Sequence, residues 1–368
     1  DIAVRRTIDD VEGYKINPDA SPDALEAKSP VRLCDLYPNI DEYRTIPTNR
    51  FYDKAVMAEE WEHLWTKVWL CAGRVSDIAN VGDWLTYQLG NISIVVVRSE
   101  DGNIRGFHNV CRHRGNILVR GDFGNARDFT CGFHSWRWNT EGHNTSVTDW
   151  GAFTEDALRG SLDLPAVATH VFAGFVWISL AASPMPFDEY LGEFQRTIAS
   201  FRLDEMKVML DVQITVPANW KVAANAFQEA YHVHAQHPQN MLDSEDLYQT
   251  DCYRNGHSRQ IGKGLTISDR WRDRSALTPV LKTVLQDVGL DPADFEGRPD
   301  AVREAVRDAK RAPDNAMQFD YSGFCDSQLT DNWIHTIFPN ITTSILPEGA
   351  QWTQYRPHPT DPEQCIYS

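Results

Sequence analysis

Two short Cys/His clusters are the residues of this sequence best suited to metal chemistry. The first reads Cys111-Arg-His113 and the second, after seventeen intervening residues, reads Cys131-Gly-Phe-His134. Each cluster supplies one thiolate and one neutral imidazole, and both groups are good ligands for zinc and for iron. The sequence therefore predicts a metal centre that is held jointly by two loops.

Two kinds of metal centre fit four such ligands. A structural zinc site would close all four into one tetrahedron, but it usually takes its Cys pair from one segment and its His pair from another. A Rieske [2Fe–2S] cluster instead places two Cys on one iron and two His on the other. Because each segment here provides one residue of each kind, the spacing favours the Rieske cluster, and a Cys2His2 zinc site is the alternative.

A second group of histidines lies further along the chain. Composition predicts a helix over residues 219–237, which ends in Glu229-Ala-Tyr-His232-x4-His237 and is stopped by Pro238. Glu229 and His232 share a helical face, whereas His232 and His237 do not. For these two histidines to bind one metal ion, the helix must bulge or end between them. An unbroken helix would pair His234 with His237 instead.

The two loops resemble the ligand motifs of the Rieske non-haem iron aromatic-ring-hydroxylating oxygenases, in their large (alpha) subunit. In that family the second loop more often reads Cys-x-Tyr-His-Gly-Trp, so Phe133 and Ser135 depart from the pattern. The resemblance implies that a [2Fe–2S] Rieske cluster is bound here. Its four ligands would be Cys111, His113, Cys131 and His134.

The helix motif matches the family's acid-x-x-His-x4-His pattern, which follows Asn-Trp-Lys. The resemblance implies that His232 and His237 bind mononuclear Fe(II), with His234 as a bystander or pocket residue. Glu229 takes the place of the bridging carboxylate, which in the family links an iron histidine of one subunit to a cluster histidine of the next, here His134. That link implies a ring of subunits, either a homotrimer or a trimer with a small beta subunit.

The iron site also needs a carboxylate ligand, which in the family is an Asp far downstream. We expect this third ligand not to be identifiable in the present chain, because the chain is truncated or segments are missing from it. The late acids lie in no matching motif; they are Asp331, Glu348, Asp361 and Glu363.

The resemblance implies a terminal oxygenase component that uses O2 to hydroxylate an aromatic or other hydrophobic substrate, with dihydroxylation favoured over monohydroxylation or demethylation. Electrons would come from a separate ferredoxin and/or reductase, because no flavin or nicotinamide motif is present. An electron-transfer protein with only a Rieske cluster is the alternative. We expect a mostly apolar pocket lined by the strand around Ile341 to Leu346 and, beside the iron helix, by Asn225, Phe227 and Tyr231.

The chain as a whole has 368 residues, which is enough for two domains. Its net charge of −17 argues against nucleic acid or a membrane surface as a partner, since both attract basic proteins. Seven scattered cysteines do not suggest a disulfide framework and favour a reduced, cytoplasmic location. Neither a transmembrane run nor a secretory signal is apparent.

The elements that must position these ligands fall into three parts. Residues 1–66 are predicted to form an N-terminal arm and a helix that pack on the catalytic domain. Short β-rich runs separated by turns predict a small all-β Rieske domain over residues 67–182. Residues 183–368 mix strands with helical stretches, such as 274–311, and predict a mononuclear-iron catalytic domain that is incomplete at its C-terminus. The expected fold class is α+β, with an antiparallel catalytic sheet flanked by helices.

Overall fold

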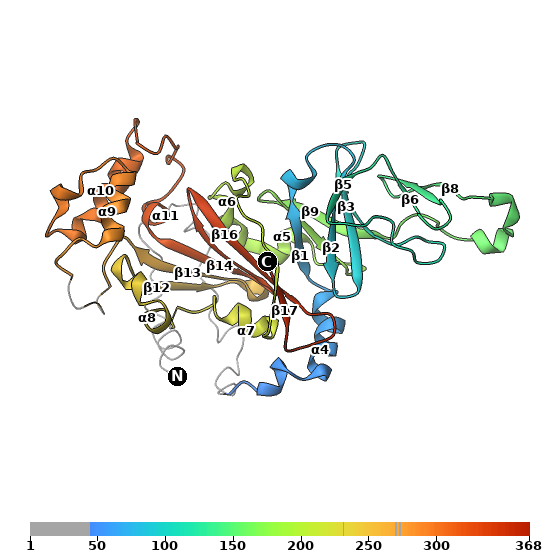
Figure 1. Ribbon diagram of the computed structural model, residues 1–368, viewed down its shortest axis with the longest axis horizontal. Coiled ribbons are helices and arrows are strands. Elements are labelled where there is room, and N and C mark those ends of the chain that lie inside the picture. The colour runs from blue at the N-terminus through green and yellow to red at the C-terminus, as the bar shows by residue number, and fades with distance from the viewer. Residues whose placement is uncertain (1–44, 231, 269–270, 272–273) are drawn as a thin grey trace. The chain divides into compact units, whose positions relative to one another are not determined.

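The chain folds into two compact units in the computed structural model, which describes residues 45–368 except 231, 269–270 and 272–273 (Figure 1). The side chains of residues 234 and 245–248 also lie outside the description. The first unit comprises residues 49–190 and 356–364, and the second is built mainly from residues 191–355 and 365–368. The predicted division of the chain at residues 66 and 182 stays a prediction.

The first unit is a small all-β structure, as the sequence predicts. A seven-stranded sheet has the order β1-β10-β9-β4-β3-β2-β5, and three further strands form the small sheet β6-β7-β8. The large sheet comprises β1 (Trp69–Arg74), β2 (Asp83–Leu89), β3 (Ile92–Arg98), β4 (Ile104–His108), β5 (Phe123–Asn125), β9 (Ala166–Phe172) and β10 (Phe175–Ser179). The small sheet comprises β6 (Asp128–Thr130), β7 (Arg137–Asn139) and β8 (Asn144–Ser146).

Helical segments flank the strands of the first unit in sequence. Helix α4 (Lys54–Glu60) begins where Asp53 accepts a hydrogen bond from the Ala55 N–H, and it continues as a π-helical turn, Trp61–Trp65. Trp65 is fully buried, as expected of an aromatic side chain on the core-facing side. Helix α5 (Phe187–Leu191) follows the last strand of the large sheet. Helix α4 belongs to the first compact unit.

The second unit is built on a seven-stranded sheet of order β11-β17-β16-β15-β14-β13-β12. Neighbouring strands run antiparallel wherever their register is resolved, which agrees with the predicted α+β class. The strands are β11 (Ile214–Val216), β12 (Ser244–Cys252), β13 (Ser258–Gly264), β14 (Asn332–Ile337), β15 (Ile341–Leu346), β16 (Gly349–Pro357) and β17 (Cys365–Tyr367).

Short helices complete the second unit: α6 (Gln195–Ala199), α7 (Trp220–Asn225), α8 (Val233–Gln236), α9 (Pro279–Asp287), α10 (Val302–Arg311) and α11 (Asp326–Thr330). Helices α9 and α10 correspond to the predicted helical stretch 274–311, and a break with two 3-10 turns separates them. Their facing sides share an apolar core that includes Leu281, Leu285 and Val306. Among the described residues, no helix has the length and apolar character needed to cross a bilayer.

One face of the sheet of the second unit carries a buried polar row across three neighbouring strands. Asp251, Arg259 and His335 are register partners on β12, β13 and β14. The Arg259 Nε donates to an Asp251 carboxylate oxygen at 2.8 Å, and both side chains are about 4% exposed. Burial, aided by the positive charge of Arg259, lowers the pKa of His335 to about 3. The His335 imidazole is therefore neutral at physiological pH. The negative charge of Asp251 and the positive charge of Arg259 then cancel, and the row carries no net charge.

Candidate functional site: two Cys/His loops and a carboxylate–histidine motif

The first Cys/His loop is closed by two backbone hydrogen bonds. Cys111 N donates to the carbonyl of Asn116 at 2.8 Å, and Gly115 N donates back to the carbonyl of Cys111 at 3.0 Å. Gly115 has a φ of +74°, a conformation that glycine adopts without steric cost. These two bonds fix a six-residue loop in which the cysteine and the histidine two positions later lie on the same turn.

The second loop repeats this construction residue for residue. Cys131 N donates to the carbonyl of Trp136 at 2.8 Å, and Ser135 N donates to the carbonyl of Cys131 at 2.9 Å. Ser135 has a φ of +60°, so it holds the left-handed conformation that Gly115 holds in the first loop. The departure of Ser135 from the family pattern thus lies at a backbone position where a side chain is strained.

Replacing Ser135 with glycine is expected to stabilise the protein by about 1 kcal/mol, because a non-glycine residue in the left-handed region costs roughly that much. The reciprocal change, Gly115→Ser, should destabilise it by a similar amount. A Cβ at Gly115 would meet no atom within 4 Å, so that cost is conformational rather than steric. Urea unfolding followed by visible absorbance would measure both changes. Equal stability of Ser135→Gly and wild type would contradict the strain.

The two histidine rings meet between the loops. The ring centroids of His113 and His134 are 4.7 Å apart. His113 stacks on Trp136 at 4.8 Å with an interplanar angle of 10°, and Phe153 meets it edge-on at 6.2 Å. Among the described residues, nothing hydrogen-bonds the buried Nδ1 atom of His113. Since buried polar atoms almost always have a partner, this nitrogen is suited to bind a metal ion.

The two cysteine thiols lie in contact with each other and accept N–H groups from their own loops. His113 N lies 3.4 Å from the Cys111 sulfur. Burial raises the pKa of Cys111 above its usual value. Burial opposes ionisation of Cys131 too, but backbone N–H groups of Phe133 and His134 outweigh it and lower its pKa. Oriented N–H donors around paired sulfurs are the environment that a bound cluster requires.

Two polar residues that the sequence motifs did not indicate support these loops. The amide nitrogen of Asn116 lies 3.6 Å from the Cys131 sulfur, so it bridges the first loop to the second. The Thr148 hydroxyl donates to the carbonyl of His134 at 2.6 Å and ties down the second histidine. Asn116 could have been found from its place, five residues after the first cysteine, once the two loops were aligned. Thr148 has no such signal, because it comes from beyond β8.

The helix predicted over residues 219–237 is interrupted, so the expectation of a continuous helix is wrong. Helix α7 begins at Trp220, capped by Asn219, whose side chain accepts from the Lys221 N–H at 3.0 Å, and ends at Asn225. Helix α8 begins only at Val233. Helix α8 in turn ends at Gln236, between His232 and His237, which is one of the two arrangements that a shared metal ion would need.

The interruption brings Glu229, His232 and His237 together. One Glu229 oxygen lies 2.7 Å from His232 Nδ1, and the other accepts the His232 backbone N–H at 3.1 Å. The rings of His232 and His237 are 5.4 Å apart and nearly perpendicular. Because Glu229 occupies Nδ1, the imidazole of His232 is oriented with Nε2 available as a ligand. Tyr231 and the side chain of His234 lie outside the described residues.

Two protein families match the segments that carry these two constellations. Residues 68–154 match the family described as Rieske [2Fe-2S] domain, and residues 203–367 match the ring hydroxylating alpha subunit catalytic domain. The chain is 31% identical over 324 residues to the glycine betaine monooxygenase oxygenase subunit of Chromohalobacter salexigens, covering 84% of this chain and 69% of that protein. This chain belongs to the Rieske oxygenases.

Other relatives of this Rieske oxygenase include both monooxygenases and dioxygenases. The biphenyl 2,3-dioxygenase subunit alpha of Rhodococcus jostii is 33% identical over 213 residues, which is 54% of this chain and 44% of that protein. The solved structure of a quaternary ammonium Rieske monooxygenase shares the fold, with a TM-score of 0.64 at 18% identity, over 88% of this chain and 74% of that one. The chain thus spans about half to three quarters of these relatives.

Membership of the Rieske oxygenases means that the protein works with a [2Fe–2S] Rieske cluster, a mononuclear iron and O2. The donor atoms on the two loops fit the cluster, since they comprise two adjacent thiols and two adjacent imidazoles, one with its Nδ1 buried and unpartnered among the described residues. The match to the Rieske domain family argues against the alternative of a structural zinc site. The match to the catalytic domain family argues against the alternative of a protein that only transfers electrons.

The late acids of this Rieske oxygenase are engaged elsewhere. Asp331, in the bend between α11 and β14, is fully buried against Arg303. Asp361 accepts the Glu363 N–H at 3.0 Å, and both belong to the first compact unit. In the part of the chain that the structure describes, no group of three or more His, Cys, Asp or Glu side chains is arranged around a single ion. The third iron ligand stays unassigned.

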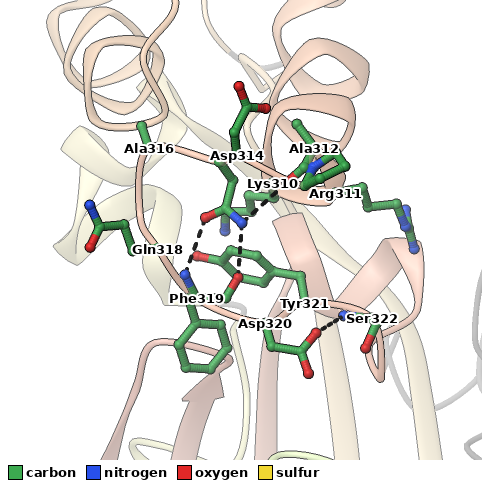
Figure 2. A pocket seen from close by; sticks show the side chains of 12 residues that line it. Lys310, Arg311, Ala312, Asp314, Ala316, Gln318, Phe319, Asp320, Tyr321 and Ser322 are labelled. Carbon is green, nitrogen blue, oxygen red and sulfur yellow. Dashed lines mark hydrogen bonds between the residues drawn. The ribbon is translucent and has the colours of Figure 1, made fainter.

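Glu348, the remaining late acid, belongs to a structural polar cluster beside a cavity of about 880 Å³ at the end of α10. Figure 2 shows the loop that lines this cavity, with Lys310 and Tyr321 on its wall. Glu348 accepts from the Tyr321 hydroxyl at 2.6 Å and pairs with Lys310 at 2.7 Å. These charges neutralise one another, so we assign the cavity no part in the chemistry.

The catalytic sheet presents a polar face on the side of the iron segment. Phe227 lies 6.0 Å from the ring of Tyr355. The Tyr355 hydroxyl lies 2.8 Å from the hydroxyl of Thr342 and 3.1 Å from that of Thr353. Because strand residues alternate, Ile341 and Ile345 of β15 point to the opposite face, whereas Leu346 shares the face of Thr342. The mostly apolar substrate pocket expected beside this strand stays a prediction.

Proposed function

We propose that this chain is a terminal oxygenase whose Rieske cluster is held by Cys111, His113, Cys131 and His134 and whose iron is held by His232 and His237. The single observation that carries the proposal is the Glu229 carboxylate, which holds the His232 ring and backbone at 2.7 and 3.1 Å. A carboxylate in this position selects the tautomer and orientation of a ligand histidine. When bound, the cluster supplies one-electron transfer and the iron supplies O2 activation.

The protein residues perform three tasks in this proposal. Trp136 and Phe153 enclose His113 and limit water at the cluster. Glu229 holds His232, and as the bridging carboxylate its exposed side chain can reach a histidine of a neighbouring subunit, which we take to be His134. The solved structure of one relative, a quaternary ammonium Rieske monooxygenase, gave insights into inter-subunit electron transfer in that protein. A homotrimer, with or without a small beta subunit, would provide such a neighbour.

We further propose that residues 67–182 act as the Rieske domain and residues 183–368 as the catalytic domain, with residues 1–66 as an arm. Electrons would come from a separate ferredoxin and/or reductase. The pocket would include Asn225 and Phe227, of which Asn225 ends α7 and Phe227 is 40% exposed. Tyr231 remains part of this proposal as a residue of the same segment.

The substrate that the site supports best is a small quaternary ammonium compound, and the reaction is a monooxygenation. The aromatic ring of Phe227, which is 40% exposed, offers a face that attracts a methylated ammonium group. The glycine betaine monooxygenase relative supports the same class. Dihydroxylation of an aromatic ring, which the motifs alone favour, is the second candidate, supported by the biphenyl dioxygenase relative.

Product analysis under labelled oxygen tests this choice. We would supply the purified protein with electrons from a surrogate reductase and offer glycine betaine or biphenyl with 18O2. Hydroxylation of an N-methyl group uses one oxygen atom, while two electrons and two protons convert the other to water, and the resulting carbinol loses formaldehyde. We expect about one formaldehyde per O2 consumed with glycine betaine. A biphenyl product that carries two labelled oxygens, with no formaldehyde from glycine betaine, would favour the second candidate.

A further inference from the structure

The connecting segment, which runs from the end of α7 at Asn225 to the start of α8 at Val233, separates one pair of backbone groups that a helix would join. In a continuous helix the His232 N–H would donate to the carbonyl of Gln228, four residues earlier. Here that N–H donates to a Glu229 carboxylate oxygen at 3.1 Å instead. The Gln228 carbonyl therefore needs an acceptor's partner from outside the helix.

A side chain from the sheet supplies this partner. Gln260 lies on β13, and its amide nitrogen donates to the carbonyl of Gln228. Gln260 is only 6% exposed, so little water competes for the bond. Two side chains thus replace one helical hydrogen bond, because Glu229 takes its donor and Gln260 takes its acceptor.

Strand β13 is a firm anchor for the connecting segment. It lies inside the sheet, since Gln260 is paired with Thr250 on one side and with Ile334 on the other. Groups built on strands are positioned more precisely than groups built on loops. The neighbouring residue of the segment, Phe227, meets the ring of Tyr355 on β16 at 6.0 Å. Two adjacent residues of the segment therefore contact the sheet.

The orientation of the Gln260 amide follows from its partner. A carbonyl oxygen can only accept, so Nε2 must face Gln228 and Oε1 must face away. Among the described residues, nothing hydrogen-bonds this buried Oε1 atom. Replacing Gln260 with Met, which has a similar length and no amide, would therefore remove the bond to Gln228 and break no second one.

We propose that Gln260 is a positioning residue for the iron site. It acts through the backbone of Gln228 and keeps the helix open where Glu229 must reach His232. The inference rests on the proposed function, since it needs His232 to be an iron ligand. Groups that orient a ligand histidine are typically worth about 10–100-fold in metal affinity or activity.

The test is Fe2+ binding to protein that keeps its [2Fe–2S] cluster and has lost its mononuclear iron to a chelator. Gln260→Met is expected to raise the dissociation constant for Fe2+ about tenfold. Without Fe2+, deuterium uptake by the peptide 226–237 should be roughly fivefold faster in this variant, which corresponds to the loss of one hydrogen bond. Combined with Glu229→Gln, the variant should weaken binding by less than the product of the two single effects, because both act on one helix break.

Gln249→Met is the matched control. Gln249 is a buried glutamine on the neighbouring strand β12, and its amide donates to Asp251 at 3.0 Å. It lies on the opposite face from Gln260, because Asp251 pairs with the residue next to Gln260. This control should bind Fe2+ as wild type does. Gln260→Asn, whose amide is one bond too short to reach the carbonyl, should repeat the effect of Gln260→Met and replaces it if that variant does not fold.

The possible failures are distinguishable. A wild-type protein that keeps its Rieske spectrum but binds no Fe2+ overturns the proposed iron site and the positioning role with it. Equal Fe2+ affinity and equal deuterium uptake in wild type and Gln260→Met overturn the positioning role alone. The same loss of affinity in Gln249→Met, or single effects that simply multiply in the double variant, would make Gln260 an ordinary packing residue of the sheet.

Discussion

Product formation is expected to fall by about 10–100-fold when Glu229 is replaced by Gln, which is the usual cost of removing the carboxylate behind a ligand histidine. Gln has the length of Glu, so the chain at this point can keep its shape. The amide has no charge, however, and only one of its two polar atoms can accept a hydrogen bond. Glu229 now uses both of its oxygens on His232, one on the ring and one on the backbone N–H.

Two measurements separate the proposed role of Glu229 from a general loss of structure. The EPR signal of the reduced Rieske cluster should still be present in Glu229→Gln, because the four cluster ligands lie on the two loops of the other unit. Single-turnover oxidation of that cluster in the presence of substrate and O2 should slow with product formation. Glu229→Asp keeps the carboxylate and should recover much of the activity. A Gln variant with wild-type turnover would leave Glu229 as a solvated surface residue.

The loops could be predicted from the sequence because their contacts are local. Each is closed by hydrogen bonds within six residues, so the spacing of Cys111 and His113, and of Cys131 and His134, already contains the geometry. The left-handed conformation of Ser135 could not be read in the same way, because serine usually avoids it. Only the repetition of the loop architecture places Ser135 opposite Gly115.

The segment around His232 and His237 shows why amino-acid composition did not predict the helix break, although residue spacing predicted the metal-binding motif. Residues 226–232 contain good helix formers, and no proline or glycine marks an end before Pro238. What accompanies the break is a side chain: Glu229 bonds the backbone N–H of His232, which offers that N–H an alternative to a helical carbonyl. Propensity does not include this competition. The metal requirement predicted a different helix end, that of α8 at Gln236, which lies between His232 and His237.

The buried polar groups of the catalytic sheet were the hardest part to predict. Asp251, Arg259 and His335 come from three strands, and the last two lie more than seventy residues apart in the sequence. Alternation along one strand indicates which residues share a face, but it does not show which strand lies next to it. The same difficulty applies to Asp331, which reads as a loop acid and is fully buried.

Asp331 connects three elements of the catalytic unit. Its carboxylate accepts hydrogen bonds from the Ser327 hydroxyl at 2.7 Å, from the Gly264 N–H at 3.1 Å and from Nη2 of Arg303 at 3.0 Å. Ser327 lies on α11, Gly264 ends β13 and Arg303 lies on α10. Gly264 has no room for a side chain, since a Cβ there would lie 2.1 Å from the carbonyl oxygen of Thr330. The site is therefore closely packed as well as charged.

Replacing Asp331 with Ala is expected to lower the free energy of unfolding by about 3–5 kcal/mol, because it leaves the largely buried Arg303 without its counter-charge. Urea unfolding at neutral pH would measure the loss. The double variant Asp331→Ala/Arg303→Met should recover part of it, since no unpaired charge is then buried. Iron content measured on folded protein distinguishes this role from metal binding. A variant that loses iron but unfolds like wild type would make Asp331 the missing iron ligand, whereas a destabilised variant with unchanged iron content establishes its carboxylate as a structural counter-ion.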